Sequence, residues 1–349
     1  MKKVLLVTEQ INPPYDEGIK KTVYNLFVGL EQRYIIKVIC REGFNDERIK
    51  VIETNRLFIS NRIKKTVKKF RPHTLIYFPF ASTTFASFVR NVILSSFCSS
   101  AQNIMVALQP KQLATWQTRL IRFLKPKIVL TPSLLLYDKL KGLKINSSLI
   151  PLPTNLENFS PNKNDETKKV LRIKYHIPPN KYVITHIGHF NEGRNLKSLV
   201  PLQKGENQVI IVGSSSTPRD SIGPASLKEK LLNTGIMIID GFIERIEEIY
   251  HLSDLYIFPV VKKNSSIDLP LSILEARACG VPVVTTNFGS TEYFLGNDNG
   301  NIFYSEPEEF PARVEEVKKL MLNKNNTSVG TLNGQFEEIL FSAIDNGKT

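Results

Sequence analysis

The sequence predicts an α/β protein with two doubly wound parallel-sheet domains. Its 349 residues suit two domains of ordinary size, each long enough to bury its own core. Short apolar runs alternate with helical apolar patterns along the chain, which is typical of parallel sheets covered by helices. Residues 254–292 hold a complete βαβ unit, because a strand, a loop, a helix, a tight turn and a second strand follow one another there.

The first half opens with a buried strand at Val4–Thr8, and a helix follows over Lys21–Leu30. The same alternation predicts further strands at Ile35–Cys40, Thr74–Phe78, Ile104–Leu108 and Ile128–Pro132. Apolar residues at helical spacing predict helices over Asn61–Phe70, Gln112–Lys127 and Ser133–Leu143. The proline-rich stretch Leu149–Pro161 then fits a linker between two domains.

The second half repeats this order. Apolar runs predict strands at Tyr182–Ile187, Gln208–Gly213, Ile236–Asp240, Leu255–Pro259 and Val281–Thr286. Helical patterns begin at Asn195 and cover Leu227–Leu232, Glu244–Asp254, Leu271–Cys279, Pro311–Leu322 and Phe336–Ala343. Ligands of such sheets bind outside the carboxyl ends of the strands. The loops Val260–Asp268 and Asn287–Glu292 are therefore candidate parts of a site.

Composition and cysteine usage restrict the class of protein. A hydrophobic content of 42% and a charged content of 23% are those of a soluble globular chain. No apolar run approaches the roughly 20 residues of a membrane span, and the short run after Met1 suits a first strand better than a signal peptide. Three scattered cysteines, Cys40, Cys98 and Cys279, indicate a reducing, cytoplasmic setting without a disulfide or metal framework.

The formal charge of +13 is unevenly distributed. Residues 1–160 hold 25 Lys and Arg against 10 Asp and Glu, a net charge of +15, whereas residues 161–349 have a net charge of −2. A first half of this kind favours an anionic partner such as a phospholipid surface or a lipid-linked phosphate. A solubilising surface is the alternative. Nucleic acid is excluded as a partner, because no zinc-finger spacing, RNA-binding strand pattern or basic zipper is present.

Two predicted helices in this half are basic and amphipathic. Lysine and arginine fill most of the polar face of Asn61–Phe70. Gln112–Lys127 combines an apolar stripe with a basic border; the stripe is Leu113, Trp116, Leu120, Phe123 and Leu124, and the border is Lys111, Arg119, Arg122, Lys125 and Lys127. This pattern is typical of helices on a membrane surface, where each basic residue contributes about 1 kcal/mol next to anionic lipid. The alternative is a helix packed on the sheet with a solvated basic face.

Glu275 is a carboxylate within the otherwise apolar run LSILEARACG. It either lies on a solvated face of the helix, beside Arg277, or has a function. The segment LPLSILEARACGVPVVTT resembles the donor-nucleotide segment of the family 4 retaining glycosyltransferases of the GT-B fold. In that family two glutamates are separated by seven residues and precede an Ala-x-Ala-x-Gly-x-Pro-Val-Val pattern. The resemblance implies that Glu275, at the second glutamate, binds the ribose hydroxyls of a sugar nucleotide.

The first glutamate of the family pattern is replaced by Ile267. It normally contacts the donor sugar, and the resemblance points to the neighbouring Asp268 as its substitute. In the loop after Tyr182–Ile187, His189 stands where the family has an arginine, and Arg194 matches a lysine that holds the donor diphosphate. The alternatives are a histidine that only caps the loop and a surface arginine.

The other implied contacts are spread over both halves. Backbone groups of Gly18, and of Gly289, Ser290 and Thr291, would approach the phosphates or the sugar. Phe242 and Ile243 would border the nucleobase. Gln109 occupies the position of a histidine near the transferred sugar, where it can hydrogen-bond a hydroxyl but cannot carry a proton at neutral pH.

The resemblance covers nearly the whole chain and is weakest in the first half. It implies an acceptor-side domain over residues 1–155, a nucleotide-sugar-binding domain over 156–325, and a C-terminal helix at 330–346 that returns to the first domain. It also implies a hexosyltransferase that retains anomeric configuration and needs no metal or other cofactor. With the basic first half, we expect a lipid-linked or membrane-surface glycan acceptor and a peripheral position on the inner face of the membrane.

Two other functions remain open at this stage. A degenerate, non-catalytic GT-B protein that binds sugar nucleotides or acts as a membrane scaffold would explain the departures at Glu17, His189, Ile267 and Ser290. A sugar-nucleotide epimerase or another GT-B enzyme would need acid and base groups in the cleft, and Gln109 at the expected histidine position argues against it. A nicotinamide-dependent oxidoreductase fits the sequence poorly, because no G-x-G-x-x-G motif follows an early strand.

Overall fold

The computed structural model describes residues 1–346 except 16, 56, 81, 125, 162–163, 214–223, 264, 297–300 and 323–331. The chain forms two compact units. The N-terminal unit comprises Met1–Pro153 together with the segment from Leu332 onward, and the C-terminal unit begins at Thr154. Each unit contains one parallel sheet, and each is described by itself below.

The N-terminal unit is built on a seven-stranded sheet in the order β3-β2-β1-β4-β5-β6-β7. Its strands are β1 (Lys3–Thr8), β2 (Ile35–Cys40), β3 (Ile49–Val51), β4 (Thr74–Phe78), β5 (Gln102–Val106), β6 (Ile128–Thr131) and β7 (Ser147–Leu149). All neighbouring pairs are parallel. The central strand β4 is buried at all five positions, as expected for a parallel sheet covered on both faces.

Six helices cover this sheet: α1 (Gly18–Glu31), α2 (Asn61–Phe70), α3 (Phe85–Ser96), α4 (Thr115–Ile121), α5 (Leu134–Gly142) and α12 (Asn333–Asn346). The helix α2 begins at Ser60, whose hydroxyl accepts a hydrogen bond from the Arg62 amide. Its Ile63 and Val67 join the core, while Lys64 and Lys68 are exposed. The amphipathic pattern of this helix is therefore realised.

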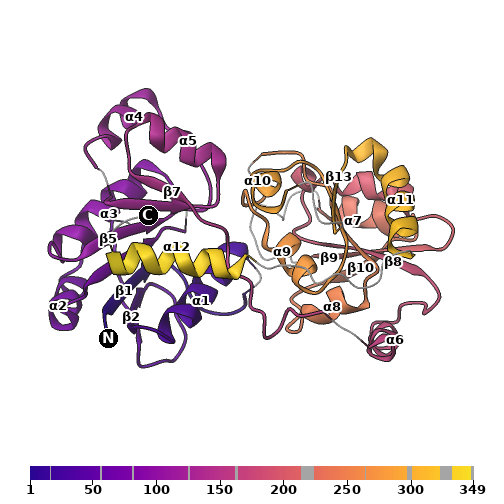
Figure 1. The fold of residues 1–349 in the computed structure, drawn as a ribbon, viewed down its shortest axis with the longest axis horizontal. Helices are drawn as coiled ribbons and strands as arrows, with labels where there is room; N and C mark the ends of the chain where they lie inside the picture. The colour runs from indigo at the N-terminus through magenta and orange to yellow at the C-terminus, as the bar shows by residue number, and fades with distance from the viewer. Residues whose placement is uncertain are drawn as a thin grey trace. The chain divides into compact units, whose positions relative to one another are not determined.

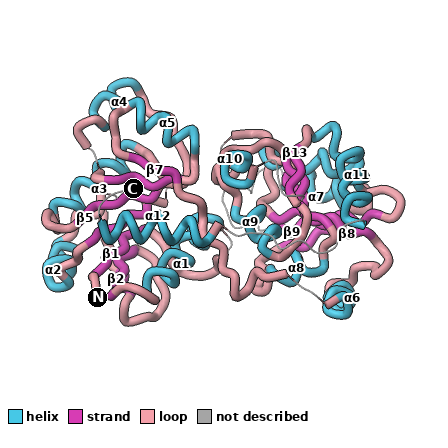
Figure 2. Tube along the Cα trace, in the orientation of Figure 1, coloured by secondary structure: helices cyan, strands magenta, loops and turns pink. Residues whose placement is uncertain are grey.

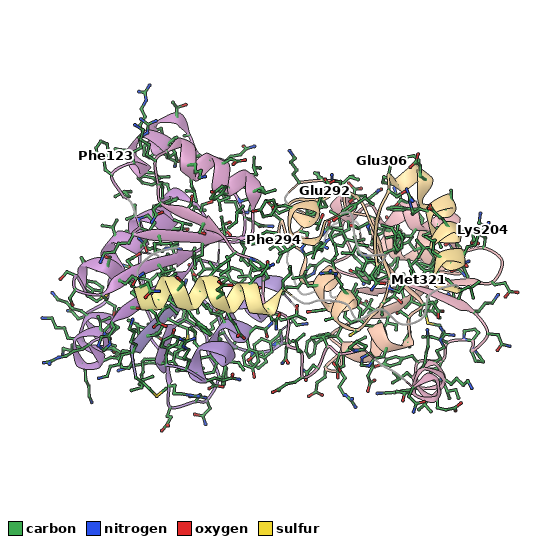
Figure 3. All side chains as sticks on the ribbon, in the orientation of Figure 1. Phe123, Lys204, Glu292, Phe294, Glu306 and Met321 are labelled. Carbon is green, nitrogen blue, oxygen red and sulfur yellow. The ribbon has the colours of Figure 1, made fainter. Side chains whose placement is uncertain are left out.

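The expectation of one long helix over Gln112–Lys127 is wrong. Only Thr115–Ile121 is helical, and the expected range also includes Pro126, a residue that is unfavourable inside a helix. The expected stripe also divides: Leu113 and Leu124 pack against the core, whereas Trp116, Leu120 and Phe123 are exposed. Figure 3 shows Phe123 at the outer edge of this unit, near α4. Lys125 of the expected basic border lies outside the described residues.

The C-terminal helix α12 completes the N-terminal unit. Its Asp345 carboxylate accepts hydrogen bonds from Arg33 and Tyr34, each at 3.2 Å, and the Lys2 ammonium donates to the Asp345 carbonyl at 2.7 Å. Phe341 packs edge-on against the Tyr34 ring. Figure 1 shows this yellow helix alongside the indigo β1 and α1, which are more than 300 residues earlier in the chain.

The C-terminal unit has a six-stranded parallel sheet in the order β10-β9-β8-β11-β12-β13. Its strands are β8 (Tyr182–Ile187), β9 (Asn207–Gly213), β10 (Met237–Asp240), β11 (Leu255–Phe258), β12 (Val283–Thr285) and β13 (Ile302–Tyr304). Figure 2 shows cyan helices on either side of these magenta strands. They are α6 (Asp165–Lys174), α7 (Pro224–Leu232), α8 (Glu247–Leu252), α9 (Leu271–Ala278), α10 (Thr291–Leu295) and α11 (Phe310–Leu322).

The expectation of an α-helix that begins at Asn195 is also wrong. Two short 3₁₀ helices occupy this stretch, η1 (Glu192–Arg194) and η2 (Leu196–Leu202). Asn195 has a left-handed backbone with φ of 56° and separates them. Pro201 lies inside η2 and removes one backbone donor, which disfavours a regular α-helix there.

Candidate active site

The C-terminal unit brings three loops together at one edge of its sheet. The order of strands reverses between β8 and β11, since the chain builds outward through β9 and β10 on one side and through β12 and β13 on the other. A crevice at such a reversal, outside the carboxyl ends of the strands, is the usual ligand site of an open parallel sheet. The segments that follow β8, β11 and β12 contain six of the predicted site residues, the last of which, Thr291, is the first residue of α10.

The loops after β11 and β12 are in direct contact. Gly289 has a φ of +61°, and a Cβ atom built on it would lie 2.2 Å from the Asp268 carbonyl oxygen. The Ser290 amide donates to that same carbonyl at 2.7 Å. Glycine is therefore required at 289 both by its backbone conformation and by the close approach of Asp268.

The loop after β8 approaches the loop after β11. A Cβ atom built on Gly193 would lie 2.0 Å from the Ser265 hydroxyl oxygen. Phe190 fills the space beside Gly213 at the end of β9, where a Cβ atom would lie 1.9 Å from its ring. Glycines at both positions thus allow the loop to fold down onto the sheet edge.

Arg194 lies in η1 and is 8% exposed. Its guanidinium and the imidazole of His186 both adjoin Gly188, since a Cβ atom there would lie 3.1 Å from Arg194 Nη1 and 3.0 Å from His186 Nε2. This burial argues against a plain surface arginine. His189 is partly exposed at the start of the same loop, and its carbonyl accepts a hydrogen bond from the Asn191 amide.

His186 was not among the predicted site residues, because a histidine in the apolar run YVITHI is typical of a core position. It is fully buried, and its Nδ1 is 2.9 Å from the Ile257 carbonyl oxygen. A carbonyl only accepts, so Nδ1 carries the proton. Burial and the nearby Arg194 charge lower the pKa of His186 to about 3, and the ring is neutral.

Glu275 is buried in α9, with only 5% of its surface exposed. The alternative position on a solvated helix face is therefore wrong, and Arg277 is buried as well. Tyr250 of α8 donates its hydroxyl proton to Glu275 Oε2 at 2.9 Å. A buried carboxylate needs such a hydrogen-bond donor, because an unpaired charge inside a protein is costly.

The remaining residues of this unit have distinct environments. Asp268 is partly exposed, whereas Ile267 beside it is buried. Phe242 is 51% exposed after β10, and Ile243 packs against the core beneath it. Thr291 is fully buried, and its hydroxyl donates to the Phe288 carbonyl at 2.7 Å.

The expectation that the backbone amides of the Gly289–Thr291 turn point at the donor is wrong for Ser290 and Thr291. The Ser290 amide donates to Asp268, and the Thr291 amide donates to the Phe288 carbonyl at 3.2 Å. Both groups are used within the protein, so they are not aimed at a donor in this structure.

Two predicted residues belong to the N-terminal unit. Gly18 is the first residue of α1, and the preceding Glu17 makes no side-chain cap. Gln109 follows β5. Its backbone N–H donates to the Ser82 hydroxyl at 3.1 Å, and its backbone carbonyl accepts a hydrogen bond from the Thr83 hydroxyl at 3.1 Å. Among the described residues, no group of three or more His, Cys, Asp or Glu side chains could hold a metal ion.

Comparisons with known proteins show what this chain is similar to. Residues 182–322 match the family described as "Glycosyl transferases group 1". A curated relative is the Escherichia coli UDP-Gal:alpha-D-GlcNAc-diphosphoundecaprenol alpha-1,3-galactosyltransferase, which is 27% identical over 166 residues. That match covers 43% of this chain and 39% of the relative, so the chain aligns with well under two thirds of the relative's length.

Solved structures resemble the chain over nearly its full length. A glycosyltransferase from Rickettsia africae ESF-5 has a TM-score of 0.71 at 16% identity and covers 99% of this chain and 94% of that one. Anabaena HepE in complex with UDP has a TM-score of 0.72 at 15% identity, with 98% and 100% coverage. WaaG, a glycosyltransferase of lipopolysaccharide biosynthesis, has a TM-score of 0.62 at 12% identity, with 98% and 95% coverage. The chain therefore has the GT-B fold of these structures, and its residues 182–322 are similar to the group 1 glycosyl transferases.

Proposed function

We propose that the protein is a retaining hexosyltransferase that moves a sugar from a nucleotide-sugar donor to a lipid-linked or membrane-surface glycan. The observation that carries this proposal is the joint burial of Glu275 and Arg194 at the strand reversal of the C-terminal sheet. One buried carboxylate and one buried guanidinium at that edge suit a ligand with ribose hydroxyls at one end and a diphosphate at the other. HepE, a structural neighbour, binds UDP and UDP-glucose, which supports uridine as the first base to test.

Each residue has a role in this reaction. Arg194 meets the diphosphate, where negative charge grows as the sugar leaves, and a preorganised cation stabilises that charge. His189 adds a second hydrogen bond there. Glu275 accepts hydrogen bonds from the ribose hydroxyls. Asp268 holds the transferred sugar, because the glutamate that has this role in the family is replaced by Ile267.

The remaining contacts are less specific to the chemistry. Phe242 and Ile243 border the base, and backbone groups of Gly18 and Gly289 approach the phosphates or sugar. Gln109 hydrogen-bonds a sugar hydroxyl. Retention follows if the leaving diphosphate accepts the proton of the incoming hydroxyl on the same face of the sugar, and this scheme requires no metal. Full activity in excess EDTA is the expected result.

The donor site is tested by thermal shift with UDP, GDP and ADP. A nucleotide at 100 times its dissociation constant should stabilise the native state by about 2.7 kcal/mol. The shift should disappear in Arg194→Met and become smaller in Glu275→Ala, whereas Arg313→Met, which removes a partly exposed arginine of α11, should keep it. Wild-type protein that responds to no nucleotide would refute the proposal.

A membrane-surface acceptor is supported by the N-terminal unit. Trp116, Leu120 and Phe123 are exposed by 56%, 45% and 85%, and the exposed Arg119 and Arg122 lie between them in sequence. Aromatic anchors beside basic residues are typical of proteins that lie on anionic bilayers. The curated relative acts on a diphosphoundecaprenol-linked sugar. Among the described residues, no helix is long and apolar enough to cross a bilayer.

Vesicle sedimentation tests this surface. The protein should bind vesicles containing anionic lipid at low salt and be released by high salt, because the attraction is screened. Phe123→Ser should weaken binding about tenfold, since one large apolar side chain no longer leaves water. Leu322→Ser is the matched control, because Leu322 is 86% exposed in the other unit. Equal binding to neutral vesicles, or equal losses in both variants, would contradict the proposal.

A non-catalytic sugar-nucleotide-binding protein is the second candidate. It is favoured by Ile267, whose buried apolar side chain stands where the family has an acid. This candidate predicts that the protein binds the nucleotide sugar but transfers the sugar neither to an acceptor nor to water. The transferase proposal predicts slow donor hydrolysis even without an acceptor, and Asp268→Ala should abolish it.

A further inference from the structure

Tyr250 has no role in the family resemblance, yet it contacts the one buried carboxylate of the proposed donor site. It lies in α8, 25 residues before Glu275, and is completely buried. Its hydroxyl donates to Glu275 Oε2 at 2.9 Å. Burial and the Glu275 charge raise the pKa of Tyr250 well above its usual value, so the hydroxyl keeps its proton and remains a donor.

The Tyr250 ring is held from two sides. The Phe159 ring, which belongs to the first residues of the C-terminal unit, packs edge-on at 5.9 Å between centroids. The Tyr256 ring of β11 lies 5.7 Å away on a tilted plane. Next to Tyr250, His251 Nε2 is 2.9 Å from the Ser160 carbonyl. The hydroxyl is therefore fixed by packing and cannot swing away from Glu275 without moving these rings.

We propose that Tyr250 is a positioning residue for Glu275 and thereby determines how strongly the protein selects ribose over 2′-deoxyribose in its nucleotide. The inference rests on the proposed function, because it assumes that Glu275 accepts the ribose hydroxyls. A glutamate has three rotatable side-chain bonds, and a fixed phenol on one carboxylate oxygen selects one orientation of the group. A carboxylate held in this way offers its acceptor directions to a vicinal diol without first losing conformational freedom.

The test compares dissociation constants for a nucleoside diphosphate and its 2′-deoxy form by calorimetry. The probe is whichever of UDP, GDP and ADP binds the wild-type protein most tightly. Tyr250→Phe keeps the ring and its packing and removes only the donor. It should weaken binding of the ribonucleotide about five- to tenfold and change binding of the deoxynucleotide less than twofold, so the ribose preference shrinks by about fivefold.

Tyr175→Phe is the matched control. Tyr175 also donates to a glutamate, with 2.8 Å between its hydroxyl and Glu248 Oε2, and Glu248 is not one of the proposed donor-site residues. It should leave the ribose preference unchanged. In the Glu275→Ala background, Tyr250→Phe should have no further effect on the preference, which distinguishes positioning from a general loss of stability.

The outcomes separate this inference from the function on which it rests. If Tyr250→Phe weakens both nucleotides equally, or if its effect persists in Glu275→Ala, the positioning role is wrong and the donor site stands. If the wild-type protein binds the ribonucleotide and the 2′-deoxynucleotide equally well, Glu275 does not recognise the ribose 2′-hydroxyl and the inference fails. If no nucleotide binds, the proposed function fails with it.

Discussion

His186 should make the stability of the C-terminal unit sensitive to mild acid. Its native pKa is lowered to about 3 from 6.5 by burial and by Arg194. Below pH 6.5 the unfolded chain binds a proton at this residue and the native protein does not. Stability therefore rises with pH between 3 and 6.5, because the unfolded state holds more protons there.

The size of this effect follows from the same two pKa values. One unit of pKa difference corresponds to about 1.4 kcal/mol. Between pH 7.5 and 5.0 the protonation of unfolded His186 should therefore destabilise the native state by about 2 kcal/mol. That is a large part of the stability of an ordinary domain.

Urea unfolding at pH 7.5 and pH 5.0, followed by circular dichroism, measures the difference. His186→Leu should lower stability at pH 7.5, since the hydrogen bond to Ile257 is lost, but should remove about 2 kcal/mol of the pH dependence. Phe258→Leu is the control, because its ring lies 6.2 Å from His186 in the same core and cannot titrate. It should lower stability equally at both pH values.

NMR titration of the histidine rings gives a direct check. The His186 signals should show the neutral form with the proton on Nδ1 throughout the range above pH 4. An inflection near pH 6.5 would refute the reasoning, and so would an identical pH dependence of wild type and His186→Leu.

Two further substitutions test the construction of the C-terminal unit. Gly289→Ala should abolish nucleotide binding and lower the free energy of unfolding by more than about 2 kcal/mol. A left-handed alanine alone costs about 1–2 kcal/mol, and the Cβ atom would also collide with the Asp268 backbone. Gly205→Ala is the control, because Gly205 has a φ of +57° but no atom within 4 Å of an added Cβ, so only the backbone cost should be seen. Asp254→Ala should destabilise by about 3 kcal/mol, because the nearly buried Arg172 guanidinium, which Asp254 accepts from at 2.6 Å, would lose its carboxylate; denaturant unfolding that shows less than 1 kcal/mol would contradict this.

Strand positions could be read from the sequence because they depend on local composition. Tyr182–Ile187 was expected with the same bounds that β8 has, and Leu255–Pro259 extends β11 by one residue. Such runs are apolar on both faces in a parallel sheet, and they need no partner to be recognised. The strands β3, β7 and β13 were missed because each is three residues long and, unlike the equally short β12, none lies within a longer apolar run.

Helices depend more on their surroundings. The helix α3 (Phe85–Ser96) was missed because its buried face includes Ser87 and Asn91, and these polar residues hide the apolar period. The stripe over Gln112–Lys127 had the correct period, yet tertiary packing buried Leu113 and Leu124 and left Phe123 exposed. Periodicity identifies which residues share a face, but it does not say whether a core covers that face.

The order of residues along the chain predicts the fold class, and it predicts the three loops and the charged residue types of the proposed C-terminal site. The burial of Glu275, the hydrogen bond that Tyr250 donates to it, and the proximity of His186 to Arg194 are visible only in the folded protein. Those facts depend on contacts between segments that are distant in sequence. The physical reason is that desolvation and hydrogen bonding are set by neighbours in space, which a linear pattern does not specify.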